Sequence, residues 1–408
     1  MRTASLAAAL LLLRGAAADL TLQSAWYFDA SVAPLIKGPW VAPLPNPITL
    51  ALRDLKADWY KVIGTSPVVT TTAAPSRWDG DTIVIFKLDS SLPAEAFTVV
   101  AGVGGAAPTL TVTGGDTRGL IYGIYHVSAD FLGVDPFWWW NDAPPVLEPM
   151  GIAVAPAYAY ASGAPAILSR GGFNNDEDLS GYFAASPLGD GVYNVAWADR
   201  LCETLLRLRA NTFIPSTFAF VDEPPYRVAA ARGLKLGNHH VMPLGNNVFA
   251  WPKGISYAYR LSPGPFQTAW QALADYQQGQ EGREMVYSLG YRGVNDEPFW
   301  NQDVGCTTDA CRGAPISQAI ANQSAIVLGT AGPLPPQRVA YIWMELLELK
   351  EAGTLVLPPG VSCVWTDFPG AFLFEGGFQN VTSGDGFCEI ARPRRRPLAR
   401  CCARGACA

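Results

Sequence analysis

The residues best suited to chemistry stand in one short turn, "SLGYRGVNDEPFW", at positions 288–300. Within six positions this turn presents one cation, Arg292, and two carboxylates, Asp296 and Glu297, and two aromatic residues follow. Hydrolysis of a glycosidic bond needs one carboxyl group to protonate the leaving oxygen and another to activate water, held roughly 6.5 to 9.5 Å apart in an inverting enzyme. Neighbours in a single loop usually cannot meet that spacing, but the density of charged groups in this glycine-flanked turn predicts a functional site, with a structural ion pair as the alternative.

Further polar residues follow other apolar runs that we interpret as strands. Asn175 and Asp176 follow the first run, His239 and His240 the third, and Asp367 a later one. Catalytic groups of a (β/α) barrel project from the carboxyl ends of its strands, so these residues are expected to meet at one site. Two alternatives stay open. Asp176 and its acidic neighbours would stabilise a helix N-terminus. The two histidines would form a hydrogen-bonded core pair, and because adjacent residues of a strand point to opposite faces, at most one of them would enter the barrel mouth.

The elements that must carry these residues change character along the chain. Residues 19–160 alternate short β-rich runs with a helical pattern and predict a small N-terminal α/β domain. Residues 161–387 repeat strand-then-helix units, which favours a (β/α)8 TIM-type barrel over an open doubly wound sheet. The proline- and alanine-rich residues 143–165 are interpreted as a linker. The stretch "PPQRVAYIWMELLELKEAG", residues 335–353, is interpreted as one strong helix.

Composition limits the classes of partner. The 408 residues leave room for two domains or one large barrel with an appendage. Hydrophobic residues make up 49 % of the chain and charged residues 16 %, which is typical of globular proteins. The net charge of −6 argues against nucleic acid and anionic membranes as partners. Neither GxGxxG nor GxxxxGK[ST] occurs, which weakens nucleotide-binding alternatives.

The N-terminal residues, the sequons and two cysteines predict whether the protein is exported. Residues 1–18 combine a basic start, an apolar run and small residues, so they predict a signal peptide and a secreted, extracellular protein. The sequons at Asn322 and Asn380 are compatible with a glycoprotein. Cys306 and Cys311 predict a surface disulfide rather than a zinc site.

The C-terminal end departs from the rest of the composition. Residues 388–408 are rich in arginine and cysteine without any periodicity, and we interpret them as an aberrant tail. A complete barrel typically needs about 250 residues, and the segment 161–387 is shorter. The barrel is therefore expected to be incomplete at its C-terminus, which leaves the activity of this truncated chain open.

Successive motifs resemble those of glycoside hydrolase family 115, the xylan α-1,2-glucuronidases. The motifs are "DTRGLIYGIYHVSADFLGVDPFWWWND", "RGGFNNDED", "LLRLRANTFIP", "GNHHVMPLGNN", "SLGYRGVNDEP" and "VWTDFPG", and their order and approximate spacing agree with the family from Asp116 to about Phe387. The resemblance implies a small α/β domain before a (β/α)8 barrel, followed by a helical domain and a β-domain. It also implies inverting hydrolysis that removes glucuronic acid, or its 4-O-methyl form, from xylan.

The resemblance implies roles for individual residues. Asp176 matches the family's acidic position after the first barrel strand, and Arg292 with Asp296 matches its Arg-Gly-x-x-Asp strand end. Glu345 is similar in placement to the glutamate that the family uses as acid catalyst, and Glu348 is the alternative in this register.

The expected catalytic residues are therefore Glu345, Asp296 and Asp367, and which aspartate acts as base is left open. The expected substrate-binding residues are Arg292, Asp176, Asn175, His239, His240 and Trp365. Arg292 would hold the uronate carboxylate through a charge-assisted bidentate contact. No metal or cofactor is needed, because side chains handle both protons. The expected partner is glucuronoxylan or a related polysaccharide.

The chain also departs from the family pattern, and two other functions stay open. "VWTDFPG" lacks the family's amide, and Val241 replaces the acidic residue that commonly follows the two histidines. These departures, with the incomplete barrel, are compatible with a non-catalytic or inactive carbohydrate-binding homologue. A hexosaminidase-like enzyme is the third reading, since a small α/β domain precedes a barrel there too. The Arg292 cluster favours an acidic sugar instead.

Overall fold

The fold was analysed in a computed structural model of the 408-residue chain. The structure describes residues 20–22, 25–28, 31–32, 46–70, 82–102, 108–141, 145–147, 151–174, 195–215, 217, 219–280, 283–330, 336–342, 344–365 and 387–388. The chain divides into two compact units. The first consists of Met1–Pro165 with Glu203–Arg209, and the second of Ala166–Cys202 with Ala210–Ala408.

The first unit contains a six-stranded mixed sheet in the order β3-β2-β4-β6-β5-β8. Its strands are β2 (Ala25–Phe28), β3 (Val68–Thr70), β4 (Ile83–Leu88), β5 (Phe97–Gly102), β6 (Thr109–Gly114) and β8 (Ala159–Ala161). The pairs β2–β3, β2–β4 and β4–β6 are parallel, whereas β5 is antiparallel to both β6 and β8. A separate antiparallel pair joins β1 (Leu20–Leu22) to β7 (Ile152–Val154). The predicted small α/β organisation is therefore present.

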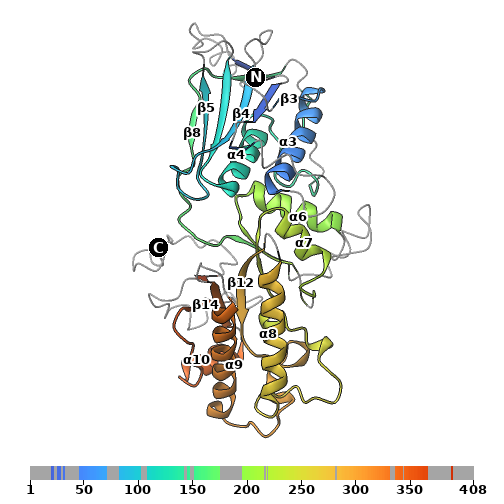
Figure 1. The fold of residues 1–408 in the computed structure, drawn as a ribbon, viewed down its shortest axis with the longest axis vertical. Helices are drawn as coiled ribbons and strands as arrows, with labels where there is room; N and C mark the ends of the chain where they lie inside the picture. The colour runs from blue at the N-terminus through green and yellow to red at the C-terminus, as the bar shows by residue number, and fades with distance from the viewer. Residues whose placement is uncertain are drawn as a thin grey trace, which may run out of the picture. The chain divides into compact units, whose positions relative to one another are not determined.

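Two helices pack on this sheet, α3 (Pro47–Ile63) and α4 (Thr117–Asp130), and Figure 1 draws both on the same side of it. A side chain caps the N-terminus of each helix: Asn46 accepts a hydrogen bond from Ile48 N–H, and Asp116 accepts one from Gly119 N–H. The core beneath α3 is aromatic: Trp26 packs edge-on against both Trp59 and Phe86, and all three are buried.

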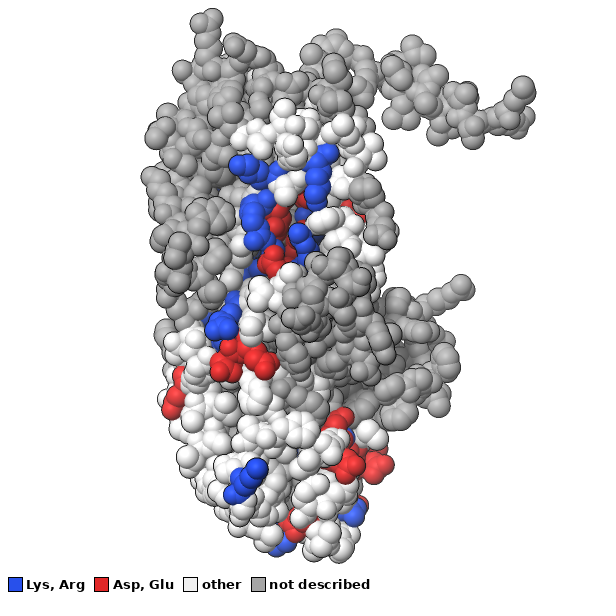
Figure 2. Space-filling view, turned by 90° about the vertical axis from the view of Figure 1, so that its right-hand side faces the viewer, with Lys and Arg blue, Asp and Glu red and all other residues white. Residues whose placement is uncertain are grey.

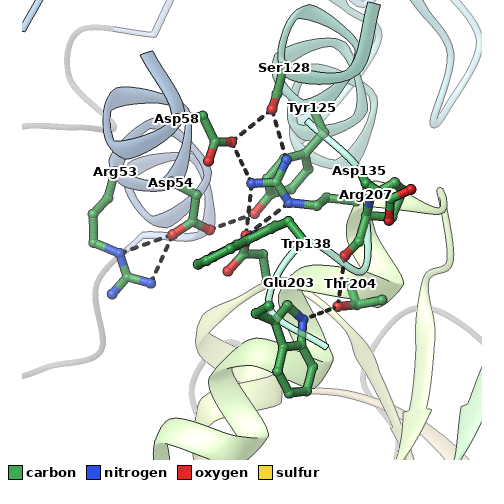
Figure 3. A network of polar contacts seen from close by, with 12 residues as sticks. Arg53, Asp54, Asp58, Tyr125, Ser128, Asp135, Trp138, Glu203, Thr204 and Arg207 are labelled. Atoms are coloured by element: carbon green, nitrogen blue, oxygen red, sulfur yellow. Dashed lines mark hydrogen bonds and ion pairs between the residues drawn. The ribbon is translucent and has the colours of Figure 1, made fainter. Parts of the chain in front are cut away.

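A buried polar network joins the helices of the first unit (Figure 3). Arg207 Nη2 lies 2.5 Å from Asp58 Oδ2 of α3, and Nη1 donates to the hydroxyl of Ser128 of α4 at 2.8 Å. Glu203 accepts from Arg207 Nε at 2.9 Å and from the indole of Trp138 at 3.1 Å. Burial raises the pKa of the Asp58 carboxyl, although Arg207 opposes the shift. The last turn of helix α6 (Val195–Arg207) is thereby fixed to α3 and α4.

The second unit is built on a parallel sheet of seven strands, which pair in chain order from β9 to β15. The strands are β9 (Gly171–Phe173), β10 (Thr212–Ile214), β11 (Lys235–Gly237), β12 (Glu284–Leu289), β13 (Gln337–Ile342), β14 (Val361–Trp365) and β15 (Phe387–Cys388). One cavity of about 170 Å³ is lined by side chains from strands as far apart as β9 and β14. The sheet therefore curves around its inner face, as part of a TIM-type barrel does.

Helices connect these strands in the alternation that the sequence predicts. They are α6, α7 (Pro224–Ala231), α8 (Pro263–Gly279), α9 (Asp309–Thr330) and α10 (Glu345–Glu351). Short 3₁₀ helices lie in two strand-to-helix loops: η2 (Pro243–Gly245) and η3 (Val248–Ala250) before α8, and η4 (Val294–Asp296) and η5 (Phe299–Asn301) before α9. Helices α8 and α9 lie side by side (Figure 1). The predicted disulfide joins Cys306, in the loop before α9, to Cys311 in the first turn of that helix, and Cys306 is buried rather than at the surface.

Three sequence-based expectations are wrong at the level of local structure. Residues 335–353 do not form one helix, because β13 occupies the first half and only α10 is helical. Residues 143–165 are more than a linker, because β7 and β8 each pair with a strand of the first unit. His239 and His240 do not alternate across a strand, because β11 already ends at Gly237.

The surface of the described residues is sparsely charged. On the face drawn in Figure 2, acidic and basic side chains occur together and most described atoms belong to neither class. Among the described residues, no helix combines the length and apolar character that crossing a membrane requires.

Candidate active site

Side chains from three neighbouring strand ends meet around Arg292. Arg292 and Asp296 lie in the loop after β12, and His240 lies in the loop after β11. Glu345 lies three residues after Ile342, the last residue of β13. Asp296 Oδ1 lies 2.6 Å from Arg292 Nε and 3.1 Å from His240 Nε2. Glu345 Oε1 lies 3.3 Å from Arg292 Nη1. The structure therefore assembles four of the residues that the sequence singled out.

The guanidinium of Arg292 is directed at both carboxylates. Its side chain is only 5 % exposed. Nη2 also donates to the backbone carbonyl of Asp296 at 2.6 Å. The contact of Nε with the Asp296 carboxylate is an ion pair by distance but lacks hydrogen-bond alignment. Because a guanidinium carries five N–H donors, these contacts leave donors on its two Nη atoms for a further acceptor.

The loop after β12 holds its residues in an uncommon backbone conformation. Asn295 and Asp296 have φ of 58° and 60°, in the left-handed region that costs energy for residues other than glycine. Gly293 N–H donates to the Glu297 carbonyl at 2.8 Å, which closes the turn around them. Such conformations persist only where the surroundings impose them and are concentrated at functional sites. The turn carries the Asp296 carboxylate back toward Arg292, four positions earlier.

Glu345 is held in a protected environment at the first position of α10. Met344 before it has φ of 47°, so the chain turns sharply there. Burial raises the pKa of the Glu345 carboxyl above its usual value, and the nearby Arg292 charge opposes part of that shift. A carboxyl group that retains its proton at a higher pH is suited to act as general acid. Glu348 is exposed, so the geometry favours Glu345 in the register that the sequence left open.

The two histidines lie face to face beside Asp296 and have different properties. Their ring centroids are 4.1 Å apart. Val241 N–H donates to Nδ1 of His239 at 3.1 Å, so the neutral ring carries its proton on Nε2. Burial, together with the charges of His240 and Arg292, lowers the pKa of His239 to about 2. His239 therefore acts as a neutral hydrogen-bonding group rather than as a cation. His240 Nε2, facing a carboxylate, donates to Asp296.

Aromatic rings line the same region. Phe173, at the end of β9, contacts His239 with ring centroids 4.6 Å apart, and Tyr341 of β13 lies 6.0 Å from His240. A pocket there is lined by His240, Tyr291, Arg292, Tyr341 and Leu346 among others. Neither Phe173 nor Tyr341 is among the site residues expected from the sequence. Phe173 was visible as the aromatic residue that ends the first strand, whereas Tyr341 was hidden by the helical interpretation of its segment.

Several expected site residues cannot be placed. Asn175, Asp176 and Asp367 lie outside the described residues. Trp365 is described only as the last residue of β14, where it pairs with Ile342 of β13. Its backbone therefore lies at the same end of the sheet as Glu345, and its side chain is not described.

Comparisons with known proteins identify the family and the fold of the chain. The family model for glycosyl hydrolase family 115 matches residues 162–372, just over half of the chain. No curated protein gives a significant match. Among solved structures, the chain is similar to BtGH115A, a family GH115 4-O-methyl-α-glucuronidase with specificity for decorated arabinogalactans. The TM-score is 0.68 at 23 % sequence identity, over 86 % of this chain and 46 % of that one.

A more distant likeness extends to another family. The GH20 β-N-acetylhexosaminidase from Streptomyces coelicolor A3(2) gives a TM-score of 0.51 at 11 % identity, over 86 % of this chain and 67 % of that chain. At these identities the likeness concerns the fold. The chain spans less than half the length of BtGH115A. With the family model matched across the strand ends that carry Arg292, Asp296 and Glu345, the chain belongs to glycoside hydrolase family 115.

Proposed function

We propose that the chain contributes the catalytic barrel of a secreted α-glucuronidase that removes glucuronic acid, or its 4-O-methyl form, from a decorated polysaccharide. The observation that carries the proposal is the contact of Arg292 with both Asp296 and Glu345 at adjacent strand ends. A carboxyl group buried beside a cation is suited to be the acid of inverting hydrolysis, and a second carboxylate, contacted by an arginine and a histidine, is a candidate for the base.

In the proposed mechanism, Glu345 is the general acid. Its raised pKa keeps the proton available for the departing glycosidic oxygen. Asp296 contacts both Arg292 and His240, and it either activates water or binds the sugar ring. Asp367 is the other candidate for the base. The unused N–H groups of Arg292 would bind the uronate carboxylate of the substrate.

Two polysaccharides are the substrates to test. Glucuronoxylan follows from the family resemblance, and decorated arabinogalactan from the specificity of BtGH115A. The full chain would be incubated with each, and release of uronic acid followed by chromatography. Early NMR spectra of the product would show which anomer forms first, and inversion predicts the anomer opposite to the substrate linkage. Binding of either polysaccharide without uronic acid release would instead support a non-catalytic homologue.

A further inference from the structure

Gln323, in the middle of α9, satisfies both backbone hydrogen-bonding groups of Gly290. Its Oε1 accepts from Gly290 N–H at 2.8 Å, and its Nε2 donates to the Gly290 carbonyl at 2.7 Å. Gln323 is fully buried. Gln323 is the middle residue of the sequon at Asn322, and it lies outside the motifs that carry the family resemblance.

The side chain of Gln323 takes over the hydrogen bonding of the β12 backbone where its pairing with the neighbouring strands ends. The pairing of β12 with β13 ends at Leu289, and its pairing with β11 ends at Val286. Gly290 is the next residue and is buried, so its N–H and C=O need partners. A glutamine side chain offers one acceptor and one donor in the same arrangement as a peptide group. Gln323 therefore replaces the neighbouring strand for one further residue.

The next residue along the chain is anchored as well. The hydroxyl of Tyr291 accepts from Tyr259 N–H at 2.9 Å and donates to the Tyr257 carbonyl at 3.1 Å. Arg292 follows directly, so two consecutive anchored residues determine where its side chain begins. The direction of the guanidinium toward the two carboxylates depends on that starting point.

We propose that Gln323 is a positioning residue of the active site, which fixes the exit of β12 and thereby the place of Arg292 and Asp296. The role in catalysis rests on the proposed function, whereas the structural role does not.

Gln277 of α8 makes a similar but single hydrogen bond to the loop after β11. It is also fully buried, and its Nε2 donates to the Leu244 carbonyl in the loop after β11 at 3.1 Å.

The first test is Gln323→Met, which keeps the length of the side chain and removes both hydrogen bonds. Hydrogen exchange followed by mass spectrometry on the full chain should show faster exchange in the peptide covering residues 288–297. Exchange in β13 should be unchanged. Uronic acid release should fall on the order of 10²-fold, the scale for a small misplacement of catalytic groups. Gln318→Met is the matched control, because Gln318 is exposed on the same helix.

The second test is Gln323→Glu, which makes the positioning dependent on pH. A protonated carboxyl group offers a donor and an acceptor, whereas an ionised one offers only acceptors and faces the Gly290 carbonyl. Burial raises the pKa of the introduced carboxyl. The ratio of variant to wild-type kcat/KM should therefore be close to one at low pH and fall as the pH rises. Exchange in residues 288–297 should increase over the same range.

The outcomes separate the two proposals. Unchanged exchange in residues 288–297, exchange raised equally throughout the chain, or a variant-to-wild-type ratio that does not vary with pH would each overturn the positioning role. If wild-type protein releases no uronic acid, the proposed function fails. The exchange measurements on Gln323→Met and Gln323→Glu still decide what Gln323 does.

Discussion

Nη1 of Arg292 lies 3.3 Å from Oε1 of Glu345, so the cation that follows β12 contacts the carboxyl group that follows β13. The contact ties the protonation of Glu345 to Arg292. Burial raises the pKa of the carboxyl and the guanidinium limits that rise. A general acid needs this balance, because its proton must be retained before the reaction and released during it.

Glu345→Gln should separate protonation of the leaving group from the rest of catalysis. Activity on a natural glucuronide should fall by about 10²- to 10⁴-fold, the usual contribution of general acid catalysis. Activity on a glucuronosyl fluoride should largely survive, because fluoride departs without a proton. Kinetics on both substrates provide the check. Glu348→Gln is the matched control, and equal loss on both substrates in Glu345→Gln would show that the acid is another residue.

Activity should decline on the alkaline side as Glu345 loses its proton. Because the pKa of Glu345 is raised, the protonated form persists to a higher pH than for an ordinary glutamate, and activity falls as the pH rises through that pKa. The measurement is kcat/KM against pH for the wild-type chain on a natural glucuronide. In Glu345→Gln with the fluoride substrate, this alkaline decline should be absent; its persistence would assign it to another group.

Arg292→Ala should remove a buried cation that serves two carboxylates. We expect a loss of about 2 to 5 kcal/mol in transition-state stabilisation, the range for losing one partner of a buried charge pair. Arg292→Lys should recover only part of it, because an ammonium group cannot reproduce the planar fork. Arg260→Ala is the control, since Arg260 pairs with Asp303 rather than with a carboxylate of the site, and its side chain is 44 % exposed against 5 % for Arg292. Normal kcat/KM in Arg292→Ala would exclude Arg292 from the site.

Part of the fold and of this site could be predicted because the pattern is local. The apolar run before Gly290 identifies β12, and the glycine-flanked turn after it identifies Arg292 and Asp296. The segment of β13 was misassigned, because its apolar residues continue into those of α10 at spacings that also fit one helix. A strand buried on both faces lacks the alternation that would have distinguished it.

The remaining features of the site depend on tertiary structure. Asn295 and Asp296 are residue types that tolerate positive φ, but the type alone does not predict that two in succession adopt it, and Met344 is a residue type seldom found there. Gln323 acts on Gly290 from a separate helix, so no local pattern reveals the pair. The position of Glu345 at a strand end becomes evident only once β13 is recognised.

Arg207→Met tests the buried network of the first unit. Removing the guanidinium leaves Asp58 and Glu203 buried without their cation, which should lower the free energy of unfolding by about 3 to 5 kcal/mol. Arg53→Met is the matched control. Arg53 is partly exposed in its pair with the buried Asp54, so its loss should cost less than the loss of the fully buried Arg207. Denaturant unfolding of both variants provides the measurement, and equal midpoints would contradict the assignment.

Asn322 should remain unmodified although it forms a sequon. It lies within α9, is half-buried, and its Nδ2 donates to the hydroxyl of Tyr259 at 2.5 Å. A glycan would have to displace that contact. Expression in a glycosylating secretory host, followed by intact mass before and after enzymatic deglycosylation, is the check. An Asn322→Gln variant should have an unchanged glycan mass, and a loss of one glycan in it would show that the site is used.

The order of the strands has a consequence for synthesis. Because β9 to β15 pair strictly in chain order, each strand can dock on its predecessor as it emerges from the ribosome, without waiting for a distant partner. The loops that carry His240, Arg292 and Asp296 are made first, and Glu345 arrives only with β13. Until then Asp296 is the only one of the two site carboxylates that can pair with Arg292. The second ion pair of Arg292, with Glu345, forms only after β13 has been translated.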